Sequence, residues 1–176
     1  MTVIDDVGLL CLAIHSGNDH EIIGRTKLQK MIYFCQYLGW DVSDYKLHYY
    51  GPFSFGLADT IKTAESSEFI DQGNAQPYTF SLTDDGNAFL EKFETRVCDT
   101  DKVADTREFI QYLSDWTKEE LELAATLDFV SQSNPNITPA NLITKVGIIK
   151  ENFDQEDIAD AYHKLLELRT IIQNLN

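Results

Sequence analysis

Apolar residues recur at helical spacing near the start of the chain. One such stripe opens the sequence and ends at a Ser-Gly-Asn-Asp turn, residues 16–19. A second stripe runs through the segment RTKLQKMIYFCQYLGW, residues 25–40, and Gly39 stands where a helix C-terminus favours glycine. The pattern predicts two helices, and the second is expected to bury Leu28, Met31, Ile32, Cys35 and Leu38.

The period changes downstream of the second helix. Residues 45–50 alternate enough to predict a short strand, after which Pro52 is placed to occupy the first turn of a third helix, where its missing N–H costs nothing. Residues 69–73 and 78–82 predict two strands joined by the loop at 73–77. These strands would form a small β-ribbon.

A fourth helix is expected after the ribbon. Thr83 suits its N-cap, and Asp84 and Asp85 fall in the first turn, where the helix dipole favours anions. Helix, helix, strand, helix, two-stranded ribbon and helix is the order of a winged helix-turn-helix. The predicted class is therefore mainly α (α+β), with a winged-helix-like domain over residues 1–98.

The rest of the chain has the pattern of a helical bundle. It follows a polar link at 98–105 and spans residues 105–176, packed on the first domain as one compact unit. Start signals, Thr117 and Thr138 among them, and helical periodicity predict four helices, near 105–114, 117–133, 138–150 and 155–173. The segment ELELAATLDFV is apolar almost all round, which is typical of a central helix. Its Asp128 is expected to be buried and to pair with a lysine or arginine.

Charge restricts the classes of partner. The 176 residues carry 14 Lys+Arg against 29 Asp+Glu, a formal net charge of −15, and a surface of that sign repels a phosphate backbone. We find no apolar run long enough for a membrane span and no signal peptide, so a cytoplasmic protein is expected. The unpaired spacing of Cys11, Cys35 and Cys98 predicts buried free thiols.

Three segments in order carry a family resemblance: RTKLQKMIYF, then HYYGPFSFGLADTI, then YTFSLTDDGNAFL. With LELAATLDFV and KENFDQEDIADAYHKLLEL in the second half, they resemble the YwgA-like family of predicted winged-helix regulators and, more distantly, the Panacea (SocA-like) antitoxin domain. The resemblance implies a winged-helix-like fold and a regulatory or antitoxin role without a settled enzymatic activity.

Cations and aromatic residues mark a candidate interaction surface. The cations near the start of the second helix could hold an anion or could form a solvated face. The aromatic strand that follows could be a recognition surface or could close the strand onto the next helix. Phe55 falls opposite the apolar face of the third helix and is expected to point outward, where it could make an apolar contact with a partner or could pack under the C-terminal bundle. We expect a mixed basic and aromatic surface that binds a protein partner. Its residues are Arg25, Lys27, Lys30, His48, Tyr49, Tyr50 and Phe55.

Other chemistries have weak support in the sequence. Between Pro52 and Ser67 the only cation is Lys62, so DNA reading through the third helix is disfavoured. No motif of a hydrolase or phosphate-binding loop is present, and His15 and His20 fit surface histidines beside a turn. We expect no catalytic residues, no metal and no cofactor.

Four hypotheses follow for function. The first is a non-enzymatic regulator that binds a toxin or a regulatory protein, and the second is a DNA-binding transcription factor that uses the cations of residues 25–46, with a homodimer as one form. The third is a small hydrolase or nucleotide sensor that uses residues 25–48. The fourth, a mimic of DNA, would use the acidic charge, but the 14 Lys+Arg are interspersed among the acids as on an ordinary solvated surface.

Overall fold

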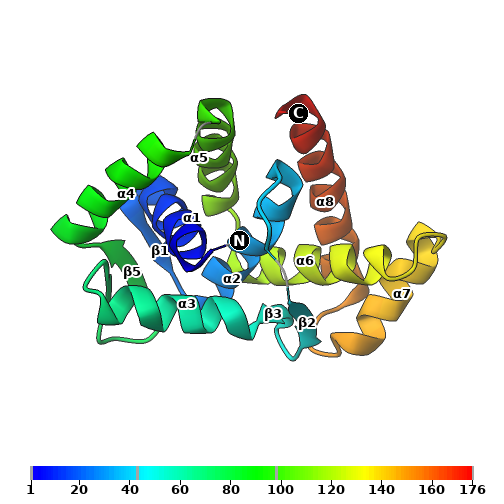
Figure 1. Cartoon of the computed structure of the whole chain (residues 1–176). Coiled ribbons are helices and arrows are strands. Elements are labelled where there is room, and N and C mark those ends of the chain that lie inside the picture. The colour runs from blue at the N-terminus through cyan, green and yellow to red at the C-terminus, as the bar shows by residue number, and fades with distance from the viewer. Residues whose placement is uncertain (1, 43, 98, 176) are drawn as a thin grey trace.

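The computed structural model describes residues 2–42, 44–97 and 99–175. Over these residues the protein is mainly helical and has two small antiparallel sheets (Figure 1). In chain order the elements are α1 Val3–Ser16, the 3₁₀ turn η1 Asn18–His20, β1 Glu21–Ile23, α2 Arg25–Phe34, the 3₁₀ turn η2 Cys35–Leu38, β2 Tyr45–His48, β3 Gly51–Ser54, α3 Phe55–Ser66, β4 Ile70–Gln72, β5 Thr79–Leu82, α4 Asp84–Arg96, α5 Thr100–Ser114, α6 Lys118–Gln132, α7 Pro139–Ile149 and α8 Gln155–Leu175.

The three-stranded sheet joins distant parts of the N-terminal half. Its order is β1-β5-β4, both pairings are antiparallel, and Phe80 of β5 lies opposite both Ile22 of β1 and Gln72 of β4. The ribbon of β4 and β5 is confirmed, whereas β1 was not predicted. Helix α4 begins as expected, because the Thr83 side chain accepts a hydrogen bond from the Gly86 N–H at 3.0 Å.

The prediction for Pro52 is wrong. Pro52 lies in β3, opposite Leu47 of β2, and the third helix starts three residues later at Phe55. The N-cap of that helix is Ser54, whose hydroxyl accepts a hydrogen bond from the Leu57 N–H at 3.0 Å. Strand β2 is confirmed, but the chain after it forms a tight hairpin instead of entering a helix.

The second half contains helices in the predicted order with one early start. Helix α5 begins at Thr100, where Asp99 caps it, so the predicted polar link at 98–105 is mostly helix. Thr117 and Thr138 cap α6 and α7 as expected. Since α5 packs against α1, and α6 packs against α2, the two halves share extensive contacts (Figure 1). The division into two domains stays a prediction.

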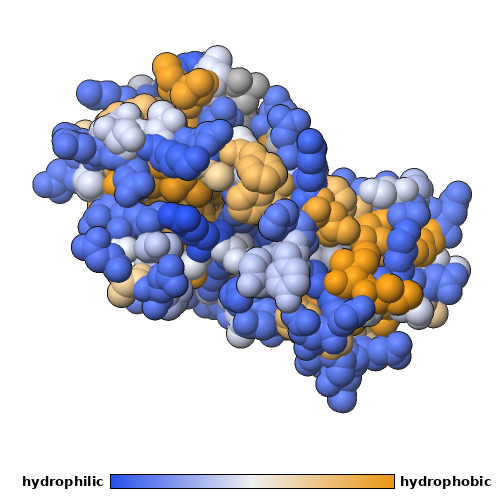
Figure 2. Space-filling model, turned by 90° about the horizontal axis from the view of Figure 1, so that it is seen from below, coloured by the Kyte–Doolittle hydropathy of each residue, from blue (hydrophilic) through white to orange (hydrophobic). Residues whose placement is uncertain are grey.

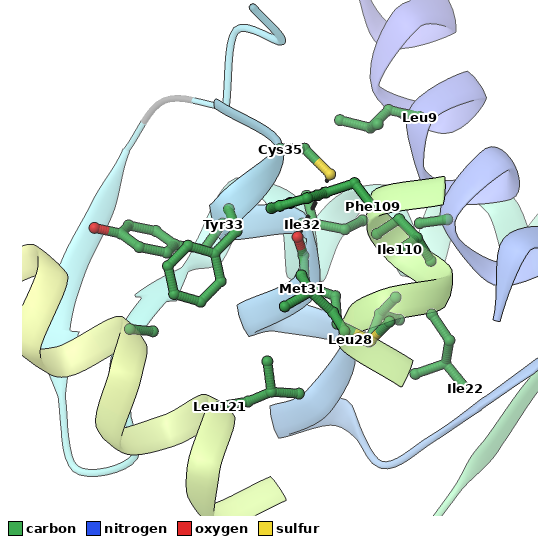
Figure 3. Packing of buried hydrophobic residues seen from close by; sticks show 14 of the residues in the cluster. Leu9, Ile22, Leu28, Met31, Ile32, Tyr33, Cys35, Phe109, Ile110 and Leu121 are labelled. Atoms are coloured by element: carbon green, nitrogen blue, oxygen red, sulfur yellow. Dashed lines mark hydrogen bonds between the residues drawn. The ribbon is translucent and has the colours of Figure 1, made fainter. Parts of the chain in front are cut away.

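Helix α2 lies at the centre of this packing. Figure 3 shows its apolar side chains between Phe109 and Ile110 of α5 on one side and Leu121 of α6 on another. All five residues predicted for the inner face of the second helix are buried, although the last two lie in η2. They are Leu28, Met31, Ile32, Cys35 and Leu38.

Two of the three cysteines can be compared with the expectation of buried free thiols. Cys11 and Cys35 are free and buried, as predicted, and burial raises the pKa of each thiol to about 12. Cys98 lies outside the described residues. Among the residues that the structure describes, no helix is both long enough and apolar enough to cross a membrane.

Truncation of the central helix tests this packing. Met31 is fully buried, so Met31→Ala should lower the free energy of unfolding by about 2 to 5 kcal/mol, through lost apolar contacts and the cavity left behind. Urea denaturation followed by circular dichroism measures the change. As a control, Val3→Ala removes a side chain that is 66% exposed and should change stability by less than about 0.5 kcal/mol. Equal effects of the two changes would contradict a core position for Met31.

Candidate functional site

The expectation that Lys30 lies on an exposed surface is wrong. Only 1% of the residue is exposed, and its Nζ donates a hydrogen bond to the carbonyl oxygen of Pro52 at 2.6 Å. The long apolar stem passes through the core, while the ammonium group reaches the backbone of β3. Lys30 therefore ties α2 to the hairpin.

Gln29 makes a second connection between α2 and the hairpin. Its side-chain amide donates to the Ser54 carbonyl at 3.0 Å, and its Oε1 accepts from the Ser54 N–H at 3.1 Å. The Tyr45 hydroxyl donates to the Gln29 carbonyl at 2.9 Å. The segment KLQK and the segment YYGPFS, which are separate in sequence, thus meet as one hydrogen-bonded unit.

A buried cluster of charges lies beneath the turn of the hairpin. Lys150, just past the end of α7, donates to Glu122 Oε1 at 2.7 Å and to the Tyr49 carbonyl at 2.5 Å. Both side chains are almost completely buried. With Lys30 they form a group of two ammonium ions and one carboxylate, which we call the charge cluster (Lys30, Glu122 and Lys150).

Electrostatics at the charge cluster favour loss of a proton from Lys30. The pKa of Lys30 is lowered to about 8; burial is the main cause, the Glu122 charge opposes the shift, and the Lys150 cation adds to it. A carboxylate shared by two buried ammonium groups compensates only part of their desolvation. Backbone carbonyls of the hairpin supply the remaining acceptors.

Gly51 allows the hairpin to approach α6 closely. Its φ of +81° lies in the left-handed region that favours glycine, and a Cβ there would stand 2.6 Å from Thr126 Oγ1. The Tyr-Gly-Pro motif is therefore needed for packing. The glycine leaves room for α6, and the proline carbonyl accepts the hydrogen bond from Lys30.

The two remaining cations of α2 lie in different places. Lys27 is half-buried and donates to the carbonyls of Ser114 and Trp116, at 2.6 and 2.9 Å, where α5 ends; burial lowers its pKa. Arg25 is exposed, donates to Gln72 Oε1 at 2.9 Å and lies 4.6 Å from the centre of a tyrosine ring in the segment before β5. The three cations thus do not converge on one anion site.

The predicted aromatic residues are exposed. Tyr49 and Tyr50 form the turn of the hairpin, with ring centres 4.9 Å apart, and Tyr50 lies 5.2 Å from the Lys118 ammonium group. Phe55 is 63% exposed, as expected for a side chain that points outward. His48 is exposed and its ring lies 5.7 Å from that of Phe53.

Exposed apolar side chains of α7 extend this surface. Asn152, after α7, donates to the Tyr49 hydroxyl at 3.3 Å, so the end of α7 borders the turn of the hairpin. Figure 2 shows hydrophobic side chains gathered over α7 and near the hairpin on the underside of the molecule. We call this surface the hairpin face, and its large exposed residues are Leu47, Tyr49, Tyr50, Phe55, Ile148 and Ile149.

Sequence reasoning missed five residues of this region. Leu47, Ile148 and Ile149 belong to the exposed surface, and Glu122 and Lys150 belong to the cluster below it. A charged residue inside ELELAATLDFV was the available signal for Glu122, because a carboxylate on a helix that is buried all round needs a cation. Lys150 gives no comparable local signal.

Asp128 is a second buried carboxylate, and it is paired with an arginine, as expected. It is fully buried, pairs with Arg169 at 2.9 Å and accepts hydrogen bonds from the hydroxyls of Tyr33 and Tyr37, each at 2.8 Å. Burial and the Asp128 charge raise the pKa of both tyrosines above the usual range. Both oxygens of the carboxylate accept hydrogen bonds from these partners, which indicates a structural role.

The histidines near η1 have partners of their own. The rings of His15 and His20 lie 4.5 Å apart, and Arg107 Nη1 lies 3.0 Å from His15 Nδ1. Burial and the Arg107 charge lower the pKa of His15. Among the residues that the structure describes, no three His, Cys, Asp or Glu side chains come close enough together to hold a metal ion.

Comparison with known proteins gives one curated similarity. The chain is 29% identical over 157 residues to "Uncharacterized protein YwgA" of Bacillus subtilis (strain 168), an alignment that covers 86% of this chain and 90% of that protein. No family model matches the chain. The similarity spans both halves, and the resemblance to YwgA-like chains is thereby supported.

The shifted pKa of Lys30 predicts how stability depends on pH. Below about pH 8 the side chain is protonated in both states; between that pH and the ordinary lysine value of about 10.4, the unfolded state binds more protons. Stability from this group should therefore rise with pH in that window, by up to roughly 3 kcal/mol.

The comparison protein for this test is Lys30→Met. Buried thiols and tyrosines have raised pKa values in the folded state, so on raising the pH they lose their protons first in the unfolded state. This lowers the free energy of unfolding at high pH, but the effect is the same in the wild type and in Lys30→Met. The free energy of unfolding of the wild type, minus that of Lys30→Met, should increase between pH 7.5 and 10 in urea denaturation. A difference that stays flat or falls would contradict a lowered Lys30 pKa.

Proposed function

We propose that the protein is a non-enzymatic regulatory or antitoxin-like protein that binds another protein through the hairpin face of a winged-helix-like scaffold. The observation that carries the proposal is the exposure of large apolar and aromatic side chains on the hairpin, at the start of α3 and at the end of α7. Soluble domains seldom expose such groups unless they bind something, and aromatic residues contribute strongly to interface energy.

The order of elements supports the winged-helix part of the proposal. Helix, strand, helix, helix and then a ribbon, with β1 paired to β5 of the ribbon, is the arrangement expected of a winged helix-turn-helix. The β2–β3 hairpin is inserted between α2 and α3. On this scaffold α3 has the place of a recognition helix, and Phe55 stands at its start.

The hairpin backbone is fixed by hydrogen bonds, and this supports a role of the hairpin face in binding. Lys30, Lys150 and Gln29 hold the hairpin backbone from below. A surface whose backbone is fixed before association loses less conformational entropy when it binds. The regulatory or toxin partner itself follows from the resemblance to YwgA-like and Panacea proteins.

Binding of DNA is the second candidate function, and its support is the element order alone. On α3 the only cation is Lys62, which is already paired with Asp59 at 2.9 Å. A DNA reader needs side chains for base edges and cations for phosphates on this helix. A net charge of −15 opposes approach to the duplex as well.

Substitutions on the hairpin face test the proposed function. The wild type is used to capture a partner from its host, and mass spectrometry and reconstitution with the purified partner identify the complex. Tyr50→Ser and Phe55→Ser should each then weaken the measured Kd at least about tenfold, since they remove exposed aromatic contacts. Each should change the free energy of unfolding by less than about 1 kcal/mol.

Ile23→Thr is the matched control for these variants. Ile23 is 55% exposed, comparable to Tyr50 and Phe55, but lies on β1 in the other sheet. The control should bind the purified partner like the wild type. If Tyr50→Ser and Phe55→Ser also retain wild-type affinity, the hairpin face is not the contact and the proposal fails.

A mobility-shift measurement tests the second candidate. On random duplex at about 0.15 M salt, binding should be no tighter than the non-specific range of ~10⁻⁴ to 10⁻⁶ M. Sub-micromolar binding that weakens steeply with salt would place the DNA-binding regulator first. An unrelated acidic protein of similar net charge gives the baseline for non-specific DNA binding.

A further inference from the structure

An acidic groove lies between α8 and the start of α6. It is close to the hairpin face, because Lys118, which precedes the groove residue Glu119, lies 5.2 Å from the Tyr50 ring. It has a volume of about 570 Å³. Leu123, Phe153 and Ala161 supply its apolar lining. Five carboxylates and one lysine also line it, and the acidic residues are Glu119, Glu120, Asp157, Asp160 and Glu167.

The acidic side chains on α8 form a stripe along one face of the helix. Asp157, Asp160, Lys164 and Glu167 follow one another at steps of three and four residues. The first and last positions are separated by ten residues, which is about 15 Å along a helix axis. A partner helix of about three turns would match that length.

The one lysine in the groove is already committed to α6. Lys164 donates to Glu120 Oε1 at 2.6 Å, and its ammonium group lies 5.1 Å from the centre of the Trp116 ring. Among the described residues, by contrast, Asp157, Asp160 and Glu167 have no ion pair. The α8 side of the groove thus has a surplus of unpaired negative charge beside an apolar lining.

We infer that this groove binds a basic amphipathic helix of a partner protein. Apolar side chains of the helix would contact the partly exposed Phe153, above a floor formed by the buried Leu123 and Ala161, and its lysines or arginines would face the carboxylates of α8. A second copy of this chain is a poor match, because each copy carries a net charge of −15. A small polycation fits only the charges, leaving the apolar lining exposed.

The test uses a synthetic 14-residue peptide of leucine and lysine with the leucines at helical spacing. Calorimetry at about 0.15 M salt should detect binding to the wild type. The double variant Asp160→Asn, Glu167→Gln should bind it roughly tenfold more weakly, because two of the carboxylates that face the peptide are lost. Thermal melting by circular dichroism checks that the variant is folded.

The matched control is Glu91→Gln, Glu108→Gln, which changes net charge equally at exposed positions on α4 and α5. It should bind within about twofold of the wild type. Equal weakening in both double variants would show attraction to overall charge only and would overturn the inference.

Two further ligands separate the groove from simple charge attraction. A peptide of identical composition but alternating leucine and lysine, and spermine, both carry positive charge without an apolar helical face. Either one binding as tightly as the helical peptide would overturn the inference. Phe55→Ser should leave peptide binding unchanged, so failure of the hairpin face as a contact and failure of this groove are distinguishable.

Discussion

Burial of the Lys30 ammonium group is the constraint on which the arrangement of the hairpin depends. A buried charge must be surrounded by acceptors, and Lys30 finds one in the Pro52 carbonyl and a counter-ion in the nearby Glu122. That requirement fixes β3 against α2 and leaves the turn of the hairpin facing solvent. The exposed aromatic residues are therefore held in place by a buried group that contacts no partner.

Helix α6 carries the two carboxylates that organise the polar interior. Glu122 pairs with Lys150 after α7, and Asp128, two turns further along, pairs with Arg169 of α8 and with tyrosines of α2 and η2. Buried ion pairs contribute little net stability compared with apolar packing, but loss of one partner is costly. Their effect here is to specify which helices pack on α6 and in which register.

Local patterns in the sequence predicted most helices, and non-local contacts decided the rest. Thr83 and the stripe on α2 act within a few residues, so periodicity and capping were sufficient to predict them. Strand β1 forms because Ile22 meets Phe80, far along the chain, and three residues give no pattern of their own. The exposed position of Phe55 was predicted, whereas the burial of Lys30 was not, because its acceptor and counter-ion lie on β3 and α6.

The inward use of cations shapes the outer surface of the protein. Lys27, Lys30 and Lys150 donate to backbone carbonyls, and Arg169 is paired with a buried carboxylate, so these positive charges are withdrawn from partners. Within the described part of the chain, the buried acids are two residues of α6, and most of the other acids face solvent. This distribution of charge is the reason why the two proposed modes of recognition differ: the hairpin face would use apolar contact, and the acidic groove would attract a basic group.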